Sequence, residues 1–95
     1  MKGHTMLETL QAKLQGLGYF SILNAQNEIE VETSSIFFTI TWESNLYAIG
    51  GAIGFHPLHG ASAEEEWTAK TMAGVLRILK REIKAQEYAD VDYPA

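Results

Sequence analysis

Two histidines and a run of glutamates form the one group in this chain whose residue types suit metal chemistry. His56 and His59 flank Pro57-Leu58, and three glutamates follow at 64–66. Two imidazoles and a carboxylate are adequate ligands for zinc. Pro57 favours an extended or turn conformation, so the spacing differs from the helical motif that places two zinc-binding histidines one turn apart. We predict that this loop is structural. A metal- or ligand-binding protein, or an enzyme, centred on His56 and His59 is the alternative hypothesis.

The remaining polar residues show no pattern typical of a catalytic site. The chain has no cysteine, which excludes disulfides, thiolate metal sites and a cysteine nucleophile. Ser62 follows His59 closely, but no third group can be assigned to orient the histidine, so a cap and a loop explain both residues better. The glycine-rich segment 50–60 matches neither phosphate-binding fingerprint, and the glutamates at 64–66 would repel an anion. We therefore expect a protein that is not an enzyme and that needs no cofactor.

Charge is distributed unevenly along the chain. The formal net charge is −5, and the segment 14–69 contains seven glutamates and no lysine or arginine. This distribution predicts an acidic sheet and a basic helix. The basic stripe predicted on that helix consists of Lys70, Arg77, Arg81 and Lys84. Four basic residues in a chain of this net charge make a poor nucleic-acid binder. We therefore expect the stripe to be a solvent-exposed face. Binding to a protein is the second alternative, and binding to nucleic acid is the third.

The segment 28–53 organises the fold because apolar and polar residues alternate along it. This period of two is typical of half-buried β-strands. Two-residue turns at Ala25-Gln26, Thr33-Ser34 and Ser44-Asn45 would place the alternating apolar residues on one face of an antiparallel meander. The predicted registers pair Phe20 with Val31, Ile22 with Ile29, Val31 with Ile36, Ile29 with Phe38, Trp42 with Tyr47, and Ile40 with Ile49.

Helices are predicted on both sides of this meander. Thr5 and Glu8 fit a capping box at the start of a helix whose leucines recur at helical spacing up to Leu17. A second capping box, Ser62 to Glu65, predicts a long helix that ends near Glu87. We expect both helices to pack on the apolar sheet face. The residues expected to be nearly buried are Ile29, Phe38, Ile40, Trp42, Leu76, Leu79 and Ile83, and those expected to be exposed are Glu28, Glu30 and Glu32.

Together these patterns predict a single α+β domain over residues 1–95. Its order is α-β-β-β-β-α, with an antiparallel meander of three to four strands, an N-terminal helix and a long C-terminal helix packed on one face. Residues 1–4 are expected to form a loose lead-in and residues 90–95 an acidic tail. No apolar run reaches the roughly 18 residues of a membrane span. We therefore expect no membrane association and a cytoplasmic protein.

The second sheet face is the predicted interaction surface. It would carry the apolar residues Phe37, Leu46 and Ala48 beside an acidic row, and exposed apolar residues on a flat strand are typical of a partner-binding site. The acidic row consists of Glu28, Glu30 and Glu32. We expect a small acidic, non-catalytic interaction domain that forms a homodimer or binds another protein. Size, charge and element order are similar to those of phage-encoded inhibitors and secretion-chaperone-like domains, although no motif supports a family assignment.

Overall fold

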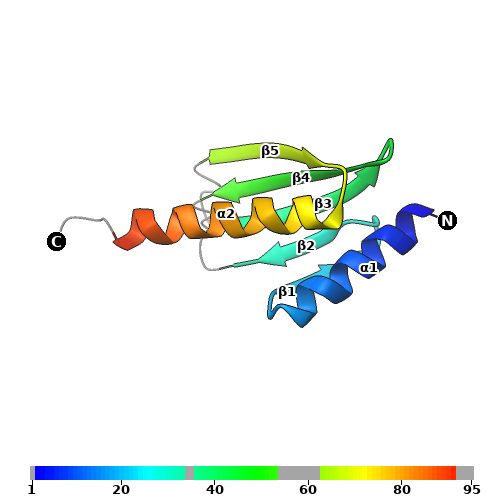
Figure 1. The fold of residues 1–95 in the computed structure, drawn as a ribbon, viewed down its shortest axis with the longest axis horizontal. Coiled ribbons are helices and arrows are strands. Elements are labelled where there is room, and N and C mark those ends of the chain that lie inside the picture. The colour runs from blue at the N-terminus through cyan, green and yellow to red at the C-terminus, as the bar shows by residue number, and fades with distance from the viewer. Residues whose placement is uncertain (1, 34–35, 54–62, 92–95) are drawn as a thin grey trace.

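A five-stranded antiparallel sheet with two helices forms the fold (Figure 1). The computed structural model describes residues 2–33, 36–53 and 63–91. The strands lie side by side in chain order, and the predicted α+β class with terminal helices is confirmed. The elements are α1 (Lys2–Gly16), β1 (Phe20–Leu23), β2 (Ile29–Glu32), β3 (Ile36–Glu43), β4 (Leu46–Ile53), β5 (Ala63–Ala69) and α2 (Met72–Val91).

Both helices differ from the predicted boundaries at their ends. α1 begins at Lys2, so residues 2–4 are helical backbone and not a loose lead-in. Thr5 consequently lies inside the helix, where its carbonyl accepts a hydrogen bond from the Thr9 hydroxyl at 2.9 Å, and it does not cap the first turn. α2 continues to Val91, past its predicted end near Glu87 and into the predicted acidic tail. Residues 92–95 lie outside the described residues.

The fifth strand lies where the sequence predicts the start of the long helix. Residues 63–69 pair with β4 along their whole length, so the prediction of a helix over this segment is wrong. The capping-box pattern is a local signal, and pairing with a neighbouring strand overrides such weak preferences. The helix begins at Met72 instead, where the Thr71 hydroxyl accepts a hydrogen bond from the Gly74 N–H at 3.0 Å as an N-cap. Lys70 therefore precedes the helix.

The predicted register between β3 and β4 is confirmed. Trp42 pairs with Tyr47 and Ile40 with Ile49. Ser44 and Asn45 both have positive φ angles, 52° and 62°, as a two-residue type I′ turn requires.

The predicted register between β2 and β3 is wrong by two residues. Val31 pairs with Phe38 and Ile29 with Ile40, and the Thr33 N–H donates to the Ile36 carbonyl at 3.1 Å. A shift of two residues leaves every side chain on its predicted face, because side chains alternate with a period of two.

The predicted register between β1 and β2 is wrong by one residue, and this error changes the fold more than the two-residue error between β2 and β3. The turn has three residues between Asn24 and Glu28, and its last residue, Asn27, adopts a φ of 59°. A type I turn followed by a left-handed residue is the usual three-residue hairpin. Because a one-residue slip moves side chains to the opposite face, Phe20 and Ile22 are 63% and 46% exposed, contrary to the prediction that they face the core.

The core lies between the sheet and the two helices. Leu10 and Leu14 of α1 and Val75 and Leu79 of α2 are fully buried against it. The predicted burial of Ile29, Phe38, Ile40 and Leu79 is confirmed. The other three predicted core residues, Trp42, Leu76 and Ile83, are only half-buried at its margin.

Candidate interaction surface

The sheet face opposite the helices, which we call the open face, carries four rows of side chains that cross the strands. The registers place residues from neighbouring strands directly beside one another in each row. Small residues and threonines occupy the centre of the face, and glutamates lie on both sides of this centre. The rows are Phe20–Glu32–Phe37–Ala52–Glu64, Ile22–Glu30–Thr39–Gly50–Glu66, Thr41–Ala48–Thr68 and Glu43–Leu46.

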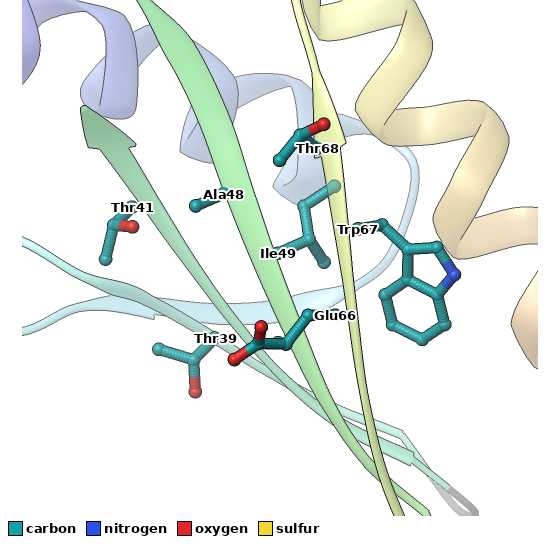
Figure 2. Close-up of a pocket in the computed structure, with 8 residues that line it drawn as sticks. Thr39, Thr41, Ala48, Ile49, Glu66, Trp67 and Thr68 are labelled. Carbon is teal, nitrogen blue, oxygen red and sulfur yellow. The ribbon is translucent and has the colours of Figure 1, made fainter. Parts of the chain in front are cut away.

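The centre of the open face is hollowed. Over β3, β4 and β5, an open hollow of about 500 Å³ lies above Ala48 and Gly50. Figure 2 shows Thr39, Thr41 and Glu66 on one side of the strands, whereas Trp67 points the opposite way, toward α2. A second hollow of about 230 Å³ continues past Phe37 and Ala52 toward Glu64. The hollow exists because the residues that β4 contributes to this part of the open face, Ala48, Gly50 and Ala52, are too small to fill it.

Asn24 organises the acidic side near β2. Its Nδ2 group donates to a carboxylate oxygen of Glu28 at 3.1 Å and to one of Glu30 at 2.8 Å. Its Oδ1 atom accepts from the backbone N–H groups of Gln26 and Glu28. Glu28 and Glu30 are therefore half-buried, contrary to prediction, whereas Glu32 is exposed as predicted. This arrangement orders the turn between β1 and β2 and concentrates negative charge beside it.

The predicted apolar residues lie on the open face, but a further pair was missed. Phe37, Leu46 and Ala48 are half-buried there. Phe20 and Ile22 on β1 are more exposed than any of these. Their alternation alone does not reveal this, because the length of the turn that follows β1 decides which face they occupy. The positive φ of Asn27 is the feature that lengthens the turn, and asparagine adopts it readily.

The predicted basic stripe does not reach the open face. Arg77, Arg81 and Lys84 are exposed on α2, in the layer on the other side of the sheet, and Lys70 is exposed between β5 and α2. The Arg81 Nε atom lies 2.9 Å from a carboxylate oxygen of its neighbour Glu82. Glu82 therefore offsets the unfavourable Arg77–Arg81 spacing, and no external anion is required for that purpose.

Tyr47 is the titratable group whose environment is most altered among the described residues, and it lies in the core. Burial raises the pKa of its phenol above the usual value of 10.0. Its hydroxyl donates to the Met6 carbonyl at 3.5 Å, so the ring contacts α1 on the side away from the open face. A fully buried phenol used in this way is a structural group and not a candidate acid or base for a bound substrate.

The histidine pair lies outside the described residues, as does Ser62. Within the residues that the structure describes, no three histidine, aspartate or glutamate side chains gather closely enough to hold a metal ion. In the same part of the chain, neither helix combines the length and the apolar character needed to cross a membrane. No protein-family model, curated protein or solved structure matches this chain.

Proposed function

We propose that this chain is a non-catalytic protein-interaction domain and that the open face is its binding surface. The observation that carries this proposal is the combination of a hollow of about 500 Å³ with partly exposed aromatic residues on the same face. Exposed apolar residues framed by charged ones are typical of protein-binding surfaces. Phe20 and Phe37 lie on either side of Glu32 in one row and supply the aromatic contact area.

The two acidic margins specify the kind of partner. Glu30 and Glu32 lie on one side of the hollow and Glu64 and Glu66 on the other. Complementary charge mainly sets orientation and encounter rate, whereas affinity comes from buried aromatic and aliphatic residues. We therefore infer a partner with a basic rim around an apolar centre. An inhibitor or adaptor of the phage or chaperone type, whose acidic face mimics nucleic acid toward a host protein, is the specific form that we propose, with a cytoplasmic location.

A homodimer remains a separate prediction. Two open faces placed against each other would bring like charges together, which is unfavourable. The open face of one copy and the basic stripe of another are complementary in sign, but such a head-to-tail contact closes only if its rotation generates a ring. Sedimentation at high protein concentration tests this prediction. A monomer would exclude the homodimer and leave a foreign partner as the proposed ligand.

The alternative function rests on His56 and His59. Metal analysis of the purified protein separates it from the interaction hypothesis. Zinc in equal proportion to protein, lost in the double variant His56→Ala with His59→Ala, would replace our proposal with a metal-binding protein.

We expect Phe37→Glu to weaken binding of the partner by about thirtyfold, the effect of losing a residue worth 2 kcal/mol at an interface. The charge would face an apolar surface and would repel the nearby acidic margins. The partner would first be isolated by affinity capture with the wild-type chain, and dissociation constants would then be measured with purified components. Arg77→Gln, which lowers the net charge by the same one unit on the helical layer, is the matched control and should change affinity little. Equal affinities of wild type and Phe37→Glu, with both proteins folded by circular dichroism, would refute the proposal.

A further inference from the structure

The two outer strands of the sheet differ in how their free edges are used. In an antiparallel ladder, alternate residues direct both backbone groups toward one neighbouring strand and the residues between them toward the other. Two backbone hydrogen bonds define this alternation: Thr33 N–H donates to the Ile36 carbonyl, and Asn24 N–H donates to the Glu28 carbonyl. Both bonds show that the even-numbered residues of β2 direct their backbone groups toward β1 and the odd-numbered residues toward β3. We call this alternation the phase of the sheet, and it can be followed from strand to strand.

The free edge of β1 is partly occupied by α1 and the turn that follows it. The phase directs the backbone groups of Tyr19 and Ser21 away from β2. The Tyr19 N–H donates to the Leu14 carbonyl at 3.0 Å, and the Ser21 carbonyl accepts from Gln11 Nε2 at 3.3 Å. Covering an edge in this way is a common protection against unwanted strand pairing.

The free edge of β5 has a different character. When the phase is continued from Ile36 through β3 and β4, the backbone N–H and C=O groups of Glu65 and Trp67 point toward β4. The backbone N–H and C=O groups of Glu64, Glu66 and Thr68 consequently point outward. Within the described residues, α2 lies over the helical face of the sheet and leaves this margin uncovered (Figure 1). β5 therefore presents a seven-residue edge with alternate donors and acceptors available for pairing.

We propose that β5 accepts an additional strand from a partner protein, an extended segment with lysine or arginine at alternate positions. This inference rests on the proposed function and specifies how the partner binds. Strand addition obtains affinity from backbone hydrogen bonds and specificity from alternate side chains. The alternate side chains on the open face would lie beside Glu64 and Glu66, which are exposed there. Opposite charges at directly paired positions stabilise a sheet, and the adjacent hollow above Gly50 accommodates the aliphatic part of a long basic side chain.

The same glutamates disfavour a second copy of this chain as the added strand. Antiparallel pairing of two β5 strands with matching faces requires registers in which residues of equal parity are opposite one another. One such register places Glu66 opposite Glu66 of the second copy, and another places Glu64 opposite Glu66. Like charges directly opposite each other destabilise strand pairs, so these two registers are unfavourable, whereas a basic strand places an opposite charge beside each glutamate.

The probe for this proposal is a blocked peptide, Val-Lys-Val-Lys-Val-Lys-Val, which matches the seven residues of β5. We expect titration, followed by amide NMR, to shift signals of Glu64, Glu66 and Thr68 and to slow the hydrogen exchange of these three amides. A peptide with glutamate in place of every lysine should not bind. Glu64→Gln with Glu66→Gln should weaken binding of the lysine peptide about fivefold, because each direct charge pair contributes modestly.

Backbone pairing is tested separately from charge. N-methylation of the central lysine amide removes a hydrogen bond to the edge and should weaken binding about tenfold, whereas N-methylation of the adjacent valine amide, which would point away, should not. Thr68→Pro should have a similar effect from the protein side without changing charge, with Thr68→Val as its control. Equal binding of the two methylated peptides, or signal changes confined to β1, would overturn the proposal. Slowed exchange of the β5 amides on raising protein concentration alone would also overturn it, because a second copy would then be the occupant.

The proposal of strand addition at β5 and the proposed function of the open face can be refuted independently of each other. Loss of partner binding in Phe37→Glu together with unchanged binding in Thr68→Pro would keep the open face as the surface and remove β5 as the strand acceptor. The reverse pattern would keep strand addition at β5 and remove the aromatic part of the open face.

Discussion

Replacing Phe38 by alanine is expected to lower the free energy of unfolding by about 3–5 kcal/mol. Phe38 is fully buried at the centre of the core, and its ring lies 6.3 Å from that of Trp67, centroid to centroid. Truncation removes the transfer free energy of the ring and leaves a cavity between the sheet and the helices that the surrounding structure fills only in part. Urea unfolding followed by tryptophan fluorescence or circular dichroism measures the change.

The adjacent residue is the matched control for this prediction. Phe37 has the same side chain but lies half-buried on the open face. We expect Phe37→Ala to cost about 1 kcal/mol, because its side chain stays partly exposed and its truncation leaves no enclosed cavity. Similar costs for the two variants, or a larger cost at Phe37, would contradict the assignment of faces on β3.

Gly51→Ala is expected to destabilise the fold by about 1–3 kcal/mol, the usual cost of overpacking. A Cβ atom at Gly51 would lie 2.8 Å from Cζ3 and 3.0 Å from Cη2 of Trp67, so the indole ring or the strand must move. Its neighbour Gly50 is the control. A Cβ atom there meets nothing closer than the Thr39 carbonyl at 3.9 Å, and we expect Gly50→Ala to change stability by no more than about 0.5 kcal/mol.

A double-mutant cycle identifies the cause of the Gly51 effect. Trp67→Leu removes the atoms that the new methyl group would meet, so Gly51→Ala should cost less in that background than in the wild type. Additive costs would show that the methyl group is tolerated beside the indole ring and that Trp67 does not cover Gly51.

The parts of the fold that the sequence predicts correctly are those where the local pattern and the tertiary contacts agree. β3 alternates between buried and half-buried residues from Ile36 to Thr41, and its turn to β4 has room for only two residues. Leu10 and Leu14 of α1 lie at helical spacing and are buried as expected. In each case, one periodic pattern satisfies both local preference and burial.

The wrong predictions for residues 63–69 and for the β1–β2 turn occur where the local sequence is compatible with two different structures. Residues 62–65 match a capping box, yet residues 63–69 also alternate between the two faces of a strand, and pairing with β4 decides in favour of the strand. The turn after Asn24 fits two or three residues equally well in the sequence. The side-chain bonds of Asn24 to the turn that follows it, together with the left-handed Asn27, select three. Neither choice could be made from periodicity alone.

The candidate surface was predicted in part for the same reasons. Phe37, Leu46 and Ala48 were placed on the correct face because the β3–β4 register was correct. Glu64 and Glu66 were missed because their segment was assigned to a helix, although they form the second acidic margin of the hollow. Which residues meet across the sheet depends on the pairing of β4 with β5, and the sequence contains no short-range signal for that pairing.

Hydrogen exchange of the individual amides of residues 64–68, measured by NMR on the isolated protein, tests the central claim that this segment is an edge strand beside the open face. The phase of the sheet predicts slow exchange at Glu65 and Trp67, whose N–H groups face β4, and fast exchange at Glu64, Glu66 and Thr68. Uniformly slow exchange along these consecutive residues would indicate a helix or a covered edge. That result would contradict both the acidic margin and the strand-accepting edge on which the account depends.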